Sequence, residues 1–133
     1  MDELHSMVDR LPRQLDWGAH LGFEDGVVTV SFDSGRAQRV HLSTREDHYV
    51  FTSRILGARR VEKYSWAELA RIVWPRNRRT PLVTFMLDEH ERLVGRIEHP
   101  AATLDPDELR AVLLHLAREC DRLEYLLTGR DEQ

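Results

Sequence analysis

The stretch TLDPDELRAVLLHLARECDRLEYLL, residues 103–127, predicts a long amphipathic helix with well-defined ends. Asp105 can cap its first turn, Pro106 occupies the first helical position, where proline is tolerated, and Glu108 can complete a capping box. Apolar residues then recur at helical spacing up to Gly129, which marks the end. They are Leu109, Val112, Leu113, Leu116, Cys120, Leu123 and Leu127. Such a helix must cover a broad apolar surface elsewhere in the chain.

Five segments rich in β-branched and aromatic residues can form that surface: residues 27–32, 38–44, 49–56, 82–87 and 92–98. The turn sequences "EDG", "DSGR", "REDH" and "DEHE" separate them, and the last of these closes a hairpin. Gly95 marks a bulge in the fifth strand. Partial alternation in the second strand directs Arg39, His41 and Ser43 toward solvent.

Two further helices are predicted. Near the N-terminus, Leu4, Met7, Val8, Leu11 and Leu15 form an apolar stripe, which Pro12 interrupts, so the helix either kinks or ends near Leu11. In the middle of the chain, Ser65 and Glu68 form a capping box, and Pro75 ends the helix ahead of a basic loop over residues 76–81.

The order of elements is therefore helix, three strands, helix, two strands, helix, with no linker or repeat between residues 1 and 133. This order predicts a single α+β domain, in which helices pack on one mainly antiparallel sheet.

Composition narrows the class of protein. The net charge is −4, and Cys120 is the single cysteine, which favours a reducing compartment over secretion. The first residues are acidic and contain no apolar signal core, and no run of about 18 apolar residues occurs. We therefore expect a cytoplasmic protein without a membrane-spanning segment.

Reactive groups are scarce. The chain contains no phosphate-binding loop, no GxSxG, HExxH or CxxC motif, and we predict no catalytic residue, cofactor or metal. Cys120 lies on the apolar stripe and is interpreted as core. His115 and Glu119 have metal-ligand spacing on a helix but lack a second pair, and His90 lies in an acidic turn.

Positive charge concentrates in one segment. Eight of the 19 basic residues lie between Arg54 and Arg79, and Arg71, Arg76, Arg78 and Arg79 form a basic patch. Phosphate contacts from this patch, with Trp74 stacking on a base, would suit a nucleic-acid-associated regulator. A solvated basic loop, or one that meets an acidic partner, is the interpretation we favour because the chain as a whole is acidic.

Four stretches resemble a known family: "GRAQRVHL", "YVFTSRI", "ERLVGRIEHPAATL" and "ELRAVLLHLARECDRLEYLLTG". They are similar to the YbjN-like family, which shares the fold of type III secretion chaperones. Members carry Gly-Arg before the second strand, Tyr then Ser in the third, and an Asp-Arg-Leu-Glu run late in the last helix. The matching positions here are Gly35, Arg36, Tyr49, Ser53, Asp121, Arg122, Leu123 and Glu124.

The resemblance implies a small homodimer without enzymatic activity that binds an extended segment of another protein, a client. In type III secretion chaperones the middle helix and the next strand make the dimer contact, and apolar patches on the sheet and first helix hold the client. By matching element, the interface candidates are Trp66, Leu69, Val73, Val83 and Phe85. The client-binding candidates are Leu4, Met7, Trp17 and Val50.

Overall fold

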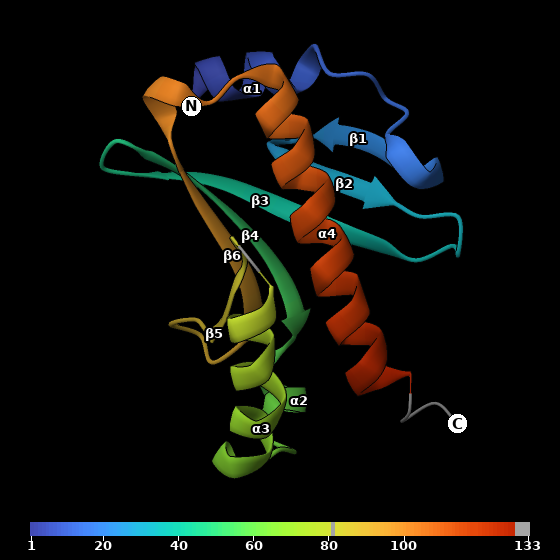
Figure 1. The fold of residues 1–133 in the computed structure, drawn as a ribbon, viewed down its shortest axis with the longest axis vertical. Helices are drawn as coiled ribbons and strands as arrows, with labels where there is room; N and C mark the ends of the chain where they lie inside the picture. Colours follow the sequence, from blue (N-terminus) through green and yellow to red (C-terminus); the bar gives the residue numbers. More distant parts are fainter. Residues whose placement is uncertain (81, 130–133) are drawn as a thin grey trace.

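One six-stranded antiparallel sheet organises the protein, and a single long helix crosses one of its faces (Figure 1). The structure, a computed structural model, describes residues 1–80 and 82–129. The strands lie in the order β1-β2-β3-β4-β6-β5. The elements are α1 (Asp2–Asp9), η1 (Asp16–Gly18), β1 (His20–Glu24), β2 (Val27–Ser31), β3 (Ala37–Arg45), β4 (His48–Leu56), α2 (Ala58–Val61), α3 (Trp66–Arg79), β5 (Thr84–Leu87), β6 (Leu93–Pro100), η2 (Ala101–Thr103) and α4 (Pro106–Thr128).

The predicted long helix is α4. The Asp105 carboxylate accepts a hydrogen bond from the Glu108 backbone N–H at 2.7 Å, and the whole predicted apolar stripe is buried against the sheet. The Glu108 side chain does not complete the capping box. It bonds His99 Nε2 at 2.8 Å instead and thereby ties the start of α4 to β6.

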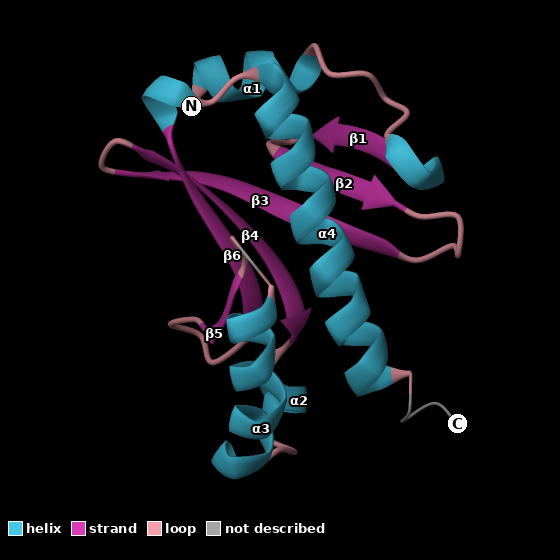
Figure 2. Cartoon of the chain, in the orientation of Figure 1, coloured by secondary structure: helices cyan, strands magenta, loops and turns pink. Residues whose placement is uncertain are grey.

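The α+β class is confirmed, and the five predicted strands correspond to β2 through β6 (Figure 2). A sixth strand, β1, was missed because "HLGFE" contains a glycine and only two large apolar residues. Leu21 and Phe23 are nevertheless in register with Val30 and Val28 of β2, so they extend the face that α4 covers. No described helix is long and apolar enough to cross a membrane.

The prediction that Pro75 ends the middle helix was wrong, because α3 continues through Pro75 to Arg79. Proline costs about 3 kcal/mol inside a helix, so the turn that follows needs external support. Asn77 supplies it: its side-chain amide donates to the Phe85 carbonyl at 3.0 Å and accepts from the Phe85 N–H at 2.7 Å. The last turn of α3 is thereby fixed to the edge strand β5.

α4 approaches the sheet closely at Gly95 of β6. A Cβ atom built on Gly95 would lie 2.3 Å from Cys120 Sγ, which is far inside van der Waals contact. Gly95 does not form the predicted bulge. It pairs regularly with Ser53 and Phe85, and the irregularity falls between Arg54 and Leu56 of β4. The glycine is therefore required for helix packing rather than for strand bending.

We expect Gly95→Ala to lower the free energy of unfolding by about 1–3 kcal/mol, because the methyl group overpacks the contact between β6 and α4. Urea unfolding measures the effect. Gly57→Ala is the matched control, since nothing lies within 4 Å of the added Cβ. Combining Gly95→Ala with Cys120→Ala should cost less than the sum of the single changes, and strict additivity would contradict the assigned contact.

Candidate protein-binding surfaces

All three tryptophans of the chain are exposed. Trp17, Trp66 and Trp74 retain 70%, 77% and 67% of their accessible surface. Large aromatic side chains are normally buried in a protein of this size, and they are enriched at protein–protein interfaces. Two surfaces contain them, one on α3 and the other beside η1.

The first surface, the α3 surface, consists of Trp66, Ala70, Val73, Trp74 and Asn77. Counted from Trp66, the other four residues follow at spacings of four, seven, eight and eleven, which places all five on one side of the helix. A shallow groove runs along this side, and it is lined by Ala70, Val73, Trp74, Asn77 and Arg78. In Figure 1, α3 stands at the end of the molecule farthest from α1.

Three predicted interface residues do not belong to this surface. Leu69, Val83 and Phe85 are buried within the chain, and Phe85 lies against β6 near Gly95. They pack α3 and β5 onto the sheet, so the structure gives them no exposed surface for a second copy. Of the predicted set, Trp66 is exposed and Val73 is half-buried.

The second surface surrounds Trp17 and is called the Trp17 surface. Trp17 has a φ of 56°, a left-handed conformation that is unfavourable for a bulky side chain. The Arg118 guanidinium of α4 lies 4.2 Å from the ring centroid, in cation–π geometry. Phe32, Asp33 and Leu114 line the depression next to the ring. Trp17 is therefore held at the surface by the backbone and by α4.

The other predicted client-binding residues lie elsewhere. Leu4 is fully buried in the core, Val50 is buried within the sheet, and Met7 is half-buried against the core. Leu4 is inaccessible to a client in this structure because the apolar stripe of α1 is used to close the chain's own core, and Val50 is inaccessible because its neighbours in the sheet cover it. Only Trp17 of the predicted set remains fully available.

A polar clamp joins the sheet to α4, and we define it as Arg36, Gln38, Ser53, Asp121 and Glu124. Arg36 donates to both carboxylate oxygens of Asp121, at 3.1 and 3.0 Å. Gln38 donates to Glu124 at 2.6 Å and accepts from the Ser53 hydroxyl at 2.7 Å. Four of these residues belong to the positions that resemble the YbjN-like family. They act as structural contacts here.

The pKa values of two members of the polar clamp are shifted, for different reasons. The hydrogen bond from Arg36 to Asp121 raises the pKa of the arginine. Burial raises the pKa of Glu124, although the hydrogen bond from Gln38 acts in the opposite direction. The folded state therefore binds a proton at Glu124 more readily than the unfolded state does. Glu124 contributes stability that is fully present at low pH and is lost as the pH rises through its folded pKa.

We expect Glu124→Gln to remove this component of the pH dependence. The amide is isosteric and can still accept from Gln38, but it does not titrate. Urea unfolding measured from pH 4.5 upward should show wild-type stability falling relative to the variant. Glu62→Gln, at an exposed glutamate, is the control. A constant difference between wild type and Glu124→Gln across this range would contradict the assignment.

The single cysteine and the histidine of the acidic turn do not form a reactive site. Burial raises the pKa of the Cys120 thiol to about 12, so the side chain is a core thiol, as interpreted from its place on the stripe. His90 Nε2 lies 3.6 Å from Glu89 in the exposed turn between β5 and β6. Within the described residues, no group of three or more His, Cys, Asp or Glu side chains is arranged to hold a metal ion.

The predicted basic patch is dispersed. Its four arginines lie on α3 rather than in a loop, and helical geometry places Arg76 on a different side from Arg71 and Arg78. Arg71 and Arg79 donate to backbone carbonyls of their own helix, at 3.2 and 3.3 Å. The patch therefore does not form one continuous phosphate-binding surface.

The sheet order, the covering helix and the displaced α3 define an α+β domain with the fold of type III secretion chaperones. A chain of the solved ExsC–ExsE complex aligns with a TM-score of 0.58 over 95% of this chain and 94% of its own, at 15% identity. A chain of the solved HopA1–SchA chaperone–effector complex aligns with a TM-score of 0.49 over 100% and 99%, also at 15% identity. No protein-family model and no curated protein matches the sequence.

Proposed function

We propose that this protein is a non-enzymatic chaperone-like or adaptor protein, which forms a homodimer and binds an extended segment of a partner protein. The observation that carries the proposal is the exposure of every tryptophan in the chain. The fold likeness to a chain of the ExsC–ExsE complex is consistent with it, because that chain was solved together with another protein. The relation to the YbjN-like family and the cytoplasmic location remain predictions from sequence.

In this proposal the α3 surface is the dimer contact. An isologous interface places the same patch of both copies face to face, so the two Trp66 and two Trp74 side chains would pack around the local twofold axis. Aromatic anchors of this kind supply most of the binding energy in interfaces. Asn77 is already bonded to Phe85, so it contributes shape rather than new hydrogen bonds.

We expect Trp66→Ala combined with Trp74→Ala to convert the dimer to monomer. Truncating an anchor residue costs about 2 kcal/mol or more, which corresponds to roughly thirtyfold weaker association for each tryptophan. Size-exclusion chromatography with light scattering measures the mass over a range of concentrations. Trp17→Ala is the matched control because it removes an equally exposed tryptophan from the other surface. A wild-type monomer at high concentration would refute the interface.

The Trp17 surface is proposed as an anchor site for the client. Extended segments bind through apolar anchors that fill grooves, and Trp17 presents a flat ring beside Phe32 and Leu114. Since Arg118 covers part of the ring, the anchor combines an apolar contact with a nearby cation.

We expect Trp17→Ala to reduce retention of the natural partner while the dimer persists. Pull-down from the native host, with the partner identified by mass spectrometry and then titrated by calorimetry, should show binding weaker by roughly thirtyfold. Trp66→Ala with Trp74→Ala gives the reciprocal control. Unchanged affinity for the partner in Trp17→Ala would exclude this surface as the anchor site.

A further inference from the structure

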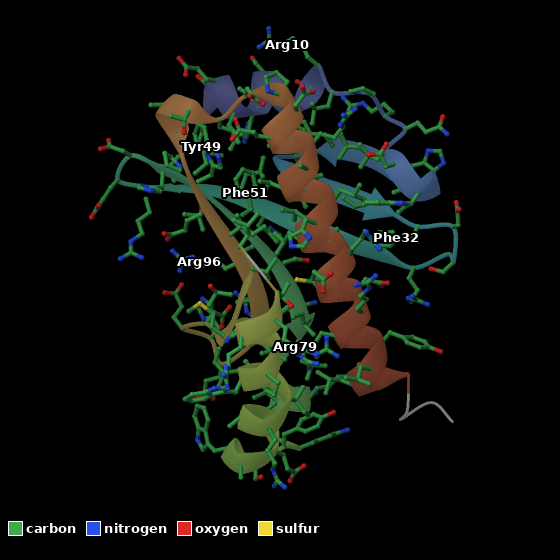
Figure 3. All side chains as sticks on the ribbon, in the orientation of Figure 1. Arg10, Phe32, Tyr49, Phe51, Arg79 and Arg96 are labelled. Carbon is green, nitrogen blue, oxygen red and sulfur yellow. The ribbon has the colours of Figure 1, made fainter. Side chains whose placement is uncertain are left out.

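The face of the sheet opposite α4 carries positive charge that the sequence prediction did not single out. Registers place two rows of side chains across four neighbouring strands, β3, β4, β6 and β5. His41, Thr52, Arg96 and Thr84 form one row. The other row consists of Arg54, Val94 and Met86. Arg39 lies next to Arg54 at the β3 end of this row, because the two arginines are one position beyond the paired residues Val40 and Ser53. Figure 3 shows Arg96 on the side of the sheet away from α4, whereas Phe51 lies between sheet and helix.

These side chains surround a depression, which we call the open-face depression. Arg39, His41, Arg54, Arg92 and Arg96 contribute to its lining, together with Val94 and Met86. Val94 is only 3% exposed although no helix covers this face. The aliphatic stems of neighbouring side chains therefore cover it, and they leave their charged ends at the surface.

Three carboxylates near the depression already have a partner. Asp88 binds Arg92 at 2.8 Å, Glu124 accepts from Gln38, and Glu98 pairs with Arg96. Glu89 lies 3.6 Å from His90. Among the described residues, Arg39 and Arg54 take part in no ion pair. Like charges on adjacent strands destabilise a sheet, so the two arginines repel each other. Arg54 also attracts Glu124 at the rim of the depression, but among the described residues it forms no ion pair with it.

The electrostatic potential of the depression is also positive at His41. The pKa of His41 is lowered, first by burial and then by Arg39, Arg92 and Arg54. Two guanidinium groups that form no ion pair among the described residues, beside an imidazole that resists protonation, are complementary to a negatively charged occupant.

We propose that the open-face depression binds an acidic extended segment of the partner protein, with its carboxylates on Arg39 and Arg54. This rests on the proposed function and specifies the chemistry of the client. Adjacent strands are about 4.8 Å apart, so carboxylates of one segment can reach both arginines, while its apolar groups contact Met86 and Val94. A nucleic acid fits less well, since no Phe, Tyr or Trp of the described strands faces this side to stack on a base.

The test is fluorescence anisotropy at low salt with a labelled synthetic peptide of alternating Glu and Thr. Wild type should bind this peptide, and a peptide of alternating Gln and Thr should not bind. Arg39→Gln with Arg54→Gln should weaken binding by about tenfold or more, because two charge-assisted contacts are lost. Arg71→Gln with Arg79→Gln removes the same charge from α3, outside the groove of the α3 surface, and should leave the affinity unchanged.

Folding and geometry are checked in the same series. Arg39→Gln with Arg54→Gln relieves repulsion, so its thermal midpoint should equal or exceed that of wild type. Arg39→Lys with Arg54→Lys keeps the charge but loses the bidentate fork, and it should bind the Glu peptide with intermediate affinity.

Several results would overturn the proposal: no binding of the Glu peptide by wild type, equal binding of the Gln peptide, or full binding by the Arg39→Gln, Arg54→Gln variant. Tighter binding of single-stranded DNA through the same two arginines would replace it with a nucleic-acid site. The dimer and the Trp17-dependent partner are measured separately. If the dimer and the partner binding are confirmed but the Glu peptide does not bind, only the acidic-segment proposal is wrong. If the Glu peptide binds but the dimer and the partner binding are not found, the proposed function is wrong.

Discussion

The contact between α4 and the centre of the sheet is the constraint on which the other features depend. Cys120 enters the space left by the missing side chain of Gly95, and it also donates to the Ser53 carbonyl at 3.9 Å. This close approach allows the apolar stripe of α4 to be fully buried, and each large side chain in it contributes about 1.5–3 kcal/mol. The polar clamp lies along the same interface, so the direction and register of α4 are fixed by hydrogen bonds as well as by packing.

One consequence is that α4, together with α1, covers one face of the six-stranded sheet, whereas among the described helices α3 lies at the edge of the sheet. α3 is attached chiefly to the edge strand β5, through Leu69 and the Asn77 bonds to Phe85. A narrow edge can bury only one side of a helix. The side that carries Trp66 and Trp74 is therefore left exposed by the geometry of the attachment, which is why we assign it to a second copy of the chain.

Much of this fold could be predicted from sequence because its signals are local. The Asp105 and Ser65 caps and the stripe of α4 are encoded in short stretches, and they were found. β1 was missed because "HLGFE" is a weak strand whose stability comes from pairing with β2. Pro75 was misread because a tertiary contact, Asn77 with Phe85, outweighs the local preference. The candidate site was harder: Trp66 and Leu69 are three residues apart and fit one apolar stripe, yet they lie on opposite sides of the boundary between surface and core. The position of β5 decides that Leu69 is buried and Trp66 is exposed.

The same reasoning separates the residues that stabilise the protein from those that cost stability. Gly95, Cys120, the polar clamp and the stripe of α4 all lie between the helix and the sheet. The unfavourable features lie outside that layer: a left-handed Trp17, exposed tryptophans on α3, and adjacent arginines at positions 39 and 54. A well-packed helix–sheet interface can support such costs, because each is small compared with the burial that α4 provides. Their position at the protein surface, outside the helix–sheet layer, is expected if those surfaces are completed by other chains, since binding then offsets each cost.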